Sequence, residues 1–444
     1  MKTRIAYGKT GLEINLPDSL NVTIGRPEPQ KTLVSAQEGV TRAINSPIGS
    51  KTIEAIIKAK QKKAPGKSLS ACIVVSDHTR PVPSHVILPP LLVKFEANGI
   101  RRENITILVG TGLHRGSTPD ELARMLGKDI PTTYKVVNHD FKDASALKSL
   151  GTSTFGTPIS INKTYTDADL KILTGYVDPH FFAGYAGGRK AIVPGISGEE
   201  TVIENHSARN INDPNARFTV LKGNPIHEDA LEIAKKVGVD FIVNVCLDEQ
   251  HRIVNVAAGG LEAVHDALVQ FMKQTVVKEF PSYFDIVVVN NGGYPLDMNL
   301  YQAVKSMVLG EMAVKEGGTI IAANEAIDGF GSDEFKAIIE TEPDPDILIK
   351  KLLTKEMHVP AQWQVQTLAR AAKRAEILVV SAMPRSAFEK VKLGLKHAES
   401  VEKAIEQALK KHGKKAKILI LPAGPQLIPC ITGSGSAACK VTPR

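Results

Sequence analysis

Short runs of β-branched and other apolar residues alternate with helical patterns along almost the whole chain. Four such runs lie in the first half and four in the second, at 71–75, 105–109, 134–137 and 170–174, then at 285–290, 318–322, 377–381 and 418–421. Strands that alternate with helices favour layered folds, because parallel neighbours need a crossover connection between them. We therefore expect an α/β protein with largely parallel sheets flanked by helices.

The length of the chain indicates two domains. It has 444 residues, whereas a single hydrophobic core usually stops growing at roughly 250 to 300 residues. Pro281 ends a helical pattern just before the first strand of the second half. We predict an N-terminal domain at 1–277, a C-terminal α/β domain at 283–444, and an active site in the cleft between them.

Composition argues against membranes and nucleic acids as partners. No apolar run approaches the roughly 20 residues that span a bilayer, and the first 16 residues lack the features of a signal peptide, so we expect a cytoplasmic protein. The formal net charge is +8, but the lysine runs at 58–63 and 410–415 lack interleaved aromatic residues that could stack on bases. The Gly- and Ser-rich run at 432–438 is typical of a mobile tail.

Polar side chains follow the predicted strands, where ligands bind in open α/β sheets. Asp77 and Arg80 follow the first strand, His114 follows the second, and His180 follows the fourth. Histidine titrates close to neutral pH and serves as either acid or base. We predict that His114 and His180 form a catalytic pair, since a reaction without a preferred hand needs a base for each enantiomer.

The run from Gly184 to Lys190 combines glycines with a basic side chain. Gly184, Gly187 and Gly188 give up side-chain packing, which is typical of places where the backbone approaches a ligand closely. On chemistry alone, Lys190 could bind phosphate, form a covalent adduct or pair with a carboxylate.

A second histidine follows at the next predicted helix. Ser197 and Glu200 have the spacing of a capping box, which predicts that a helix starts there and carries His206 about two turns in. Such rigid placement suits a metal ligand.

Two residues of the second half complete the predicted site. Gln302 and Lys305 are three residues apart and so lie on the same face of a helix. The fork of Arg80 and the point charge of Lys305 both suit a substrate carboxylate, although simple solvation at the surface is an alternative for either cation.

These motifs together resemble the lactate racemase family, the nickel-pincer enzymes. The matching pieces occur in the family's order at 77–81, 110–114, 175–190 with His206, and Gln302 with Lys305. The resemblance spans nearly the whole chain. It implies a racemase or epimerase that acts on a 2-hydroxy carboxylic acid, lactate or a close relative.

The resemblance also implies a cofactor made by other proteins. In the family, the lysine at the position of Lys190 carries a pyridinium-3-thioamide-5-thiocarboxylic acid mononucleotide, whose two sulfurs and one ring carbon bind nickel. His206 would complete the square plane, a geometry suited to Ni(II), and Asp77 and Tyr301 would contact the cofactor. One histidine would take the hydroxyl proton while the Cα hydride passes reversibly to the cofactor, through a 2-keto acid.

Two alternatives stay open at this point. Gly110 and Gly112 after a strand invite a nicotinamide-dependent dehydrogenase, but Arg115 stands where the third glycine belongs and Gly116 comes one position late. A non-catalytic carboxylate-binding protein is the other. Further candidates to shape the pocket are His78, Tyr294, Tyr301 and Trp363, and Arg115 and Arg189 are candidates to bind a second substrate carboxylate.

Overall fold

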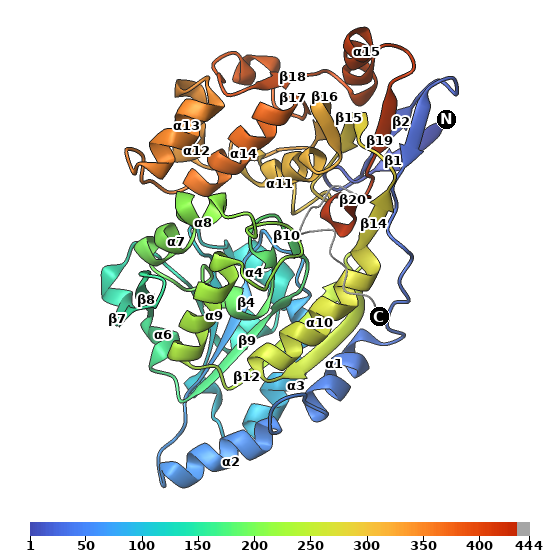
Figure 1. The fold of residues 1–444 in the computed structure, drawn as a ribbon. Helices are drawn as coiled ribbons and strands as arrows, with labels where there is room; N and C mark the ends of the chain where they lie inside the picture. Colours follow the sequence, from blue (N-terminus) through green and yellow to red (C-terminus); the bar gives the residue numbers. More distant parts are fainter. Residues whose placement is uncertain (433–444) are drawn as a thin grey trace.

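The computed structural model describes residues 1–432 and contains two large sheets, each flanked by helices (Figure 1). The first sheet has the strand order β13-β12-β9-β4-β5-β6, and only β13 runs antiparallel to its neighbour. Its strands are β4 (Ala71–Ser76), β5 (Ile105–Gly110), β6 (Lys135–Asn138), β9 (Leu170–Tyr176), β12 (Phe241–Leu247) and β13 (Ile253–Gly259). The run at 432–438 lies, except for Thr432, outside the described residues.

The second sheet is parallel throughout, in the order β18-β17-β16-β15-β19-β3. Its strands are β3 (Asn21–Ile24), β15 (Phe284–Val289), β16 (Val314–Ala323), β17 (Glu376–Val380), β18 (Leu395–His397) and β19 (Lys417–Ile420). All eight predicted strands are present, so the sequence pattern identified the central strands of both sheets correctly. Smaller pairs are β1 (Lys2–Ile5) with β2 (Leu12–Asn15), β7 (Leu147–Thr152) with β8 (Pro158–Asn162), β10 (Pro179–His180) with β11 (Gly184–Tyr185), and β14 (Val277–Phe280) with β20 (Ile428–Ile431).

The N-terminal segment joins the second sheet rather than the first. Strand β3 pairs in parallel with β19, from Asn21 opposite Lys417 to Ile24 opposite Ile420, and the β1–β2 hairpin lies next to this edge in Figure 1. The expected division into 1–277 and 283–444 did not anticipate that a strand from the first range would pair with a strand of the second. Its boundary near 277–283 stays a prediction. The pairing could not be read from the sequence because a four-residue strand with half-exposed side chains has no partner signal of its own.

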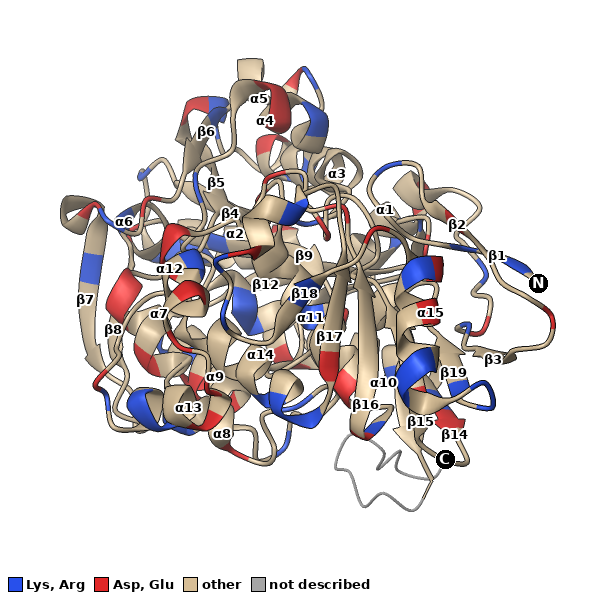
Figure 2. Cartoon of the chain, turned by 90° about the horizontal axis from the view of Figure 1, so that it is seen from above, with Lys and Arg blue, Asp and Glu red and all other residues tan. Residues whose placement is uncertain are grey.

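Helices cover the faces of both sheets. They are α1 (Ala36–Asn45), α2 (Ile53–Lys63), α3 (Ser84–Ala97), α4 (Pro119–Leu126), α5 (Ile130–Thr133), α6 (Lys163–Thr166), α7 (Glu199–Asn205), α8 (Ala208–Asn212), α9 (Pro225–Val237), α10 (Leu261–Val276), α11 (Leu300–Glu311), α12 (Asp333–Thr341), α13 (Pro345–Leu353), α14 (Gln362–Arg374) and α15 (Val401–His412). Within the described part of the chain, no helix has the length and apolar character needed to cross a bilayer. Figure 2 shows basic and acidic residues interspersed on outer helices such as α15.

The predicted helix start at Ser197 is wrong, whereas α4 does begin with a capping box. Thr118 caps α4, and the side chain of Glu121 returns to the backbone of Thr118, which completes a capping box. Ser197 does not cap the next helix, because its hydroxyl donates to the carbonyl of Ile192 at 2.7 Å. Helix α7 therefore begins after Gly198, and His206 is its C-terminal cap rather than a residue inside it.

Candidate active site

A cleft of about 1080 Å³ lies between the two sheets. The loops after β4, β5, β6 and β9 line one wall, and the start of α11 and the segment after β16 line the other. All nine residues predicted for the site are among those that line it, namely Asp77, Arg80, His114, His180, Lys190, His206, Tyr301, Gln302 and Lys305. The expected position of the site, in the cleft between two α/β units, therefore agrees with the structure, and the role of each side chain stays a prediction.

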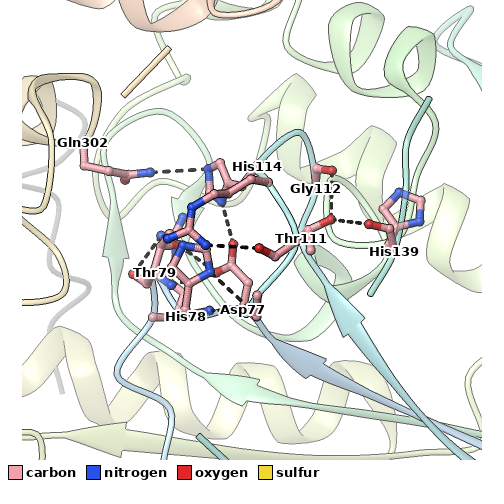
Figure 3. A network of polar contacts seen from close by, with 12 residues as sticks. Asp77, His78, Thr79, Thr111, Gly112, His114, His139 and Gln302 are labelled. Carbon is pink, nitrogen blue, oxygen red and sulfur yellow. Dashed lines mark hydrogen bonds and ion pairs between the residues drawn. The ribbon is translucent and has the colours of Figure 1, made fainter. Parts of the chain in front are cut away.

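Asp77 and His114 form the centre of a polar network at the first wall (Figure 3). Oδ2 of Asp77 lies 2.7 Å from Nδ1 of His114, while Oδ1 accepts the hydroxyl of Thr79 at 2.7 Å. Burial alone would raise the pKa of Asp77, but His114 and Arg80 outweigh it and hold the pKa well below its usual value. Asp77 is therefore an anion that accepts the Nδ1 proton of His114, which leaves Nε2 of that ring as a proton acceptor.

The other wall contacts the same histidine. Nε2 of His114 lies 3.4 Å from the side-chain nitrogen of Gln302, and the side-chain oxygen of Gln302 accepts Nζ of Lys305 at 2.6 Å. The predicted shared helix face of Gln302 and Lys305 is confirmed by this contact. Because its oxygen is engaged by an ammonium, the amide of Gln302 must present its NH₂ group to His114.

Thr79 links Asp77 to Arg80, a connection that the sequence did not reveal. Nη1 of Arg80 donates to the hydroxyl of Thr79 at 2.6 Å and to its carbonyl at 3.1 Å. No carboxylate among residues 1–432 forms an ion pair with Arg80 or Lys305. Two cations at the cleft thus lack an acidic partner, as a site for an anionic ligand requires.

His180 has the opposite hydrogen-bond pattern from His114. The backbone N–H of Ala183 donates to Nδ1 of His180 at 3.3 Å, so the proton of the neutral ring is on Nε2. Burial, followed by the charges of Lys190 and Lys305, lowers the pKa of His180 well below its usual value and keeps the ring neutral. The two imidazoles of the cleft therefore differ in tautomer, with the ring proton on Nδ1 in His114 and on Nε2 in His180.

Phe182 brings three of the predicted residues together. Its ring lies 4.5 Å from that of His180 and 5.0 Å from that of His206, between centroids, and Nζ of Lys190 lies 5.6 Å from its centre. Burial is the main cause that lowers the pKa values of Lys190 and His206 well below their usual values. Phe182 was not among the residues predicted for the site, although its position two residues after His180 was an available signal.

Two aromatic residues close the cleft on the side of the second domain. Nε1 of Trp363 donates to the hydroxyl of Tyr301 at 2.8 Å, and the indole ring lies 5.1 Å from the ring of His206. Trp363 and His78 line the cleft, as suggested for both. Tyr294 is not among the lining residues, and its ring instead contacts Nζ of Lys9 at 4.8 Å.

The glycines near Lys190 are explained by the protein's own packing. Gly184 and Gly187 have φ values of 76° and 79°, which disfavour any residue with a side chain. A Cβ atom would lie 2.1 Å from the carbonyl oxygen of Val220 at the first position and 2.8 Å from that of Tyr176 at the second. The expected reason, close approach of a ligand, is not needed to account for them.

The same holds for the glycines that suggested a dehydrogenase. The N–H of Gly112 donates to the carbonyl of Gly195 at 2.9 Å, and a Cβ on Gly110 would lie 3.2 Å from that oxygen. The chain itself therefore packs against the loop where a pyrophosphate would lie. Helix α4 begins only at Pro119, so no helix N-terminus directly follows the loop as dinucleotide binding requires.

Neither arginine suggested for a second substrate carboxylate is a free cation. Arg115 forms a two-point ion pair with Glu121, with both nitrogen–oxygen distances at 2.8 Å. Arg189 is 1% exposed and is held by backbone carbonyls below the cleft. Of the side chains predicted to bind a carboxylate, Arg80 and Lys305 thus remain without an ion pair among residues 1–432.

Known proteins match the chain over nearly its whole length. Residues 7–219 match the family model of the lactate racemase N-terminal domain, and residues 278–428 match that of the lactate racemase C-terminal domain. A lactate racemase from Thermoanaerobacterium thermosaccharolyticum is 37% identical over 430 residues, which are 96% of this chain and 98% of that protein. A lactate racemase from Lactiplantibacillus plantarum is 37% identical over 394 residues, 88% of this chain and 90% of that protein.

Solved structures agree with these matches. The lactate racemase apoprotein from T. thermosaccharolyticum has a TM-score of 0.85 at 35% identity, covering 97% of this chain and 100% of that one. A protein from Thermotoga maritima has a TM-score of 0.64 at 19% identity, covering 86% and 99%, a likeness of fold alone. The predicted two-domain α/β fold and the predicted family are both confirmed. The chain belongs to the lactate racemase family and is an isomerase.

Proposed function

We propose that the protein interconverts the enantiomers of a 2-hydroxy carboxylic acid, lactate or a close relative. The observation that carries the proposal is the convergence of nine side chains, from segments far apart in the sequence, on one cleft. Basic side chains for a carboxylate and two imidazoles of different tautomer lie within it. The relatives that match the chain over most of its length are lactate racemases, which supports lactate as the first substrate to test.

The residues of the cleft fit a covalently held nickel-pincer nucleotide. Burial lowers the pKa of Lys190 well below its usual value and, among residues 1–432, its Nζ has no hydrogen-bond or ion-pair partner, as expected of an amine that is to be acylated. His206 is a neutral imidazole, the form that binds Ni(II). Lys190 would hold the cofactor, His206 the metal, and Asp77 and Tyr301 would contact the nucleotide. When bound, this group supplies an acceptor for the Cα hydrogen as hydride, so that the substrate passes through a planar 2-keto acid.

The side chains of the protein orient the substrate. Arg80 and Lys305 bind its carboxylate, since both are cations without an acidic partner in the described chain. Gln302 holds Lys305 through its oxygen and contacts His114 through its nitrogen, which couples carboxylate binding to the position of the base. The aromatic rings of Phe182 and Trp363 exclude water from this part of the cleft.

The two histidines serve the two hands of the substrate. Nε2 of His114 accepts the hydroxyl proton of one enantiomer, and Asp77 stabilises the imidazolium that results. His180 serves the other enantiomer in the same way, accepting its hydroxyl proton as a neutral ring and returning a proton to the oxygen only from its imidazolium form. A turnover therefore starts with one ring neutral and the other protonated and ends with these states exchanged, so the reverse reaction uses the rings in exchanged roles.

The test is intact-mass spectrometry with nickel analysis on protein produced together with the proteins that make the cofactor. Wild type is compared with Lys190→Ala and with Lys62→Ala, a matched loss of an exposed lysine on α2. We expect a mass increment, bound nickel and racemisation of lactate, followed by chiral chromatography, in wild type and Lys62→Ala but not in Lys190→Ala. An unmodified, nickel-free protein that still binds 2-hydroxy acids would instead favour a non-catalytic carboxylate-binding protein.

Substrate range, partners and location are part of the same proposal. A panel of 2-hydroxy acids with longer or charged side chains identifies the substrate. We propose the cofactor biosynthesis proteins as partners, neither nucleic acid nor membrane as a ligand, and a cytoplasmic location. Cell fractionation with an antibody to the native protein tests the location.

A further inference from the structure

Trp363 is the only tryptophan of the chain, and it lies where two parts of the candidate active site meet. It occupies the first turn of α14, a helix that lies against α8 (Figure 1). Its Nε1 donates to the hydroxyl of Tyr301 at 2.8 Å, and its ring lies 5.1 Å from the ring of His206, with the two planes at 61°. One buried side chain therefore contacts both a predicted cofactor contact and the predicted metal ligand.

Two glutamines of α14 hold the segment that contains His206. Nε2 of Gln362 donates to the carbonyl of Ile203 at 3.4 Å, and Nε2 of Gln366 donates to the carbonyl of Ala208 at 3.0 Å. These carbonyls lie on either side of His206 in the sequence. His206 itself only caps the short helix α7, and its Nδ1 has no hydrogen-bond partner in the described chain. The position of this imidazole therefore depends on contacts from α14.

The contact with Trp363 also decides which way the hydroxyl of Tyr301 can act. An indole N–H is a donor only, so the phenol oxygen must be the acceptor and its proton must point elsewhere. No atom of residues 1–432 accepts that proton. The ring of Tyr301 lines the cleft and is held from behind by Phe335, 5.8 Å away between centroids. The hydroxyl is thus a hydrogen-bond donor that is available to a ligand.

We propose that Trp363 is a positioning residue that holds Tyr301 as a hydrogen-bond donor to an oxygen of the bound nucleotide and holds the ring of His206 in place. The proposal rests on the proposed function, in which Tyr301 contacts the cofactor and His206 binds the metal. A phenylalanine at 363 would fill the same space but would let the phenol proton turn away from the cleft. A donor-only ring removes that freedom, which explains why a tryptophan suits this position.

The first test needs no ligand and uses protein without cofactor. A ¹H–¹⁵N NMR spectrum contains one indole signal, because the chain has one tryptophan. We expect Tyr301→Phe to move the indole proton signal upfield, since Nε1 loses its acceptor. Tyr294→Phe removes a hydroxyl outside the cleft and leaves the signal in place. An unchanged signal in Tyr301→Phe would overturn the proposal.

The second test measures whether the two side chains act together on a ligand. Binding of nicotinic acid mononucleotide, a pyridinium mononucleotide, is followed by calorimetry in Trp363→Phe, Tyr301→Phe and the double variant. We expect Trp363→Phe to weaken binding by about three- to tenfold, the value of one hydrogen bond between neutral groups. In the Tyr301→Phe background the same change has no further effect. Equal losses in both backgrounds would reduce Trp363 to packing and overturn its action through Tyr301.

The third test concerns the ring of His206. Protein without cofactor is treated with diethyl pyrocarbonate, and modification of His206 and of the exposed His85 is measured by peptide mass spectrometry. We expect His206 to react several times faster in Trp363→Leu than in wild type, whereas Trp363→Phe, which keeps an aromatic ring there, restores the wild-type rate. His85 reacts alike in all three. An unchanged rate at His206 in Trp363→Leu would overturn this part of the proposal.

Failure of this proposal and failure of the proposed function have different signatures. If nickel-loaded wild type racemises lactate but the effects of Trp363→Phe and Tyr301→Phe simply add, the enzyme stands and the role of Trp363 falls. If the two effects are coupled but the protein acquires no adduct with the biosynthesis proteins present, the positioning stands and the cofactor assignment falls. Wild type that binds no mononucleotide overturns the donor role of Tyr301. Circular dichroism of each variant establishes that folded proteins are compared.

Discussion

Nδ1 of His114 lies 2.7 Å from Oδ2 of Asp77, and this contact joins the ends of two neighbouring parallel strands. Asp77 follows β4 directly and His114 belongs to the loop after β5. The aspartate is buried and the histidine is partly exposed to the cleft. The sheet therefore fixes both the orientation of the imidazole and the nitrogen that is left to react.

Asp77→Asn tests this contact directly. The amide keeps the shape of the carboxylate but cannot stabilise an imidazolium, so we expect kcat to fall by about a hundredfold or more with a small change in KM. Steady-state racemisation in both directions provides the measurement. Asp140→Asn is the matched control, because Asp140 is exposed on the same wall of the cleft; an equal loss in that variant would contradict the role of Asp77.

The cations of the cleft are expected to affect substrate binding more than turnover. Arg80→Gln removes the fork that would hold the carboxylate, at a cost of about 1.5 to 3 kcal/mol for a charge-assisted hydrogen bond, so KM rises by about tenfold or more. Lys305→Met also leaves the oxygen of Gln302 without its donor. Arg115→Gln serves as the control, since Arg115 is already paired with Glu121. A KM equal to that of wild type in Arg80→Gln would contradict the assignment.

The raised pKa of Asp178 predicts how the stability of the fold depends on pH. Burial raises its pKa to about 7, with partial compensation by Lys305 and Arg80. Between about pH 4, the pKa of an unfolded aspartate, and pH 7, the folded protein holds a proton that the unfolded chain has lost, so this contribution to stability decreases as pH rises. We expect Asp178→Asn to raise the melting temperature relative to wild type at pH 8 but not at pH 4. Thermal unfolding of the cofactor-free protein across this range checks the sign.

The capping box of α4 predicts a local effect on stability. Thr118 accepts the N–H of Glu121, and the side chain of Glu121 accepts the N–H of Thr118. Thr118→Ala therefore costs about 1 kcal/mol, measurable by denaturant unfolding, and leaves racemisation intact. Thr132→Ala is a suitable control, because Thr132 only donates to a backbone carbonyl at an exposed position.

The sequence was sufficient to predict the strands whose residues are apolar and β-branched, and the polar residues that follow them. Position after a strand is a local property, so Asp77, His114 and His180 could be found from one chain. The resemblance added what local patterns cannot supply, the separate roles of Lys190 and His206. Contacts between distant segments, such as Gln302 with His114 or Trp363 with Tyr301, depend on side-chain direction and could not be predicted.

The errors have physical causes. Ser197 has the composition of a helix cap, but its hydroxyl bonds backward to Ile192, so the spacing alone was misleading. The glycines near Lys190 were attributed to a ligand, whereas positive φ and the nearby carbonyl of Val220 are sufficient reasons. Strand β12 was missed although it is buried throughout, because Asn244 interrupts its apolar run.

The strand β3 is synthesised before every strand that surrounds it in the finished sheet. It belongs to the first part of the chain to leave the ribosome, whereas its partner β19 lies close to the other end of the chain. The second domain therefore cannot complete its sheet until β19 has been made, near the end of synthesis, and β3 has no strand partner before then. A fragment that begins at residue 283 would lack β3 and would leave the edge of β19 unpaired. The N-terminal segment and the second domain therefore have to be produced together for the second sheet to be complete.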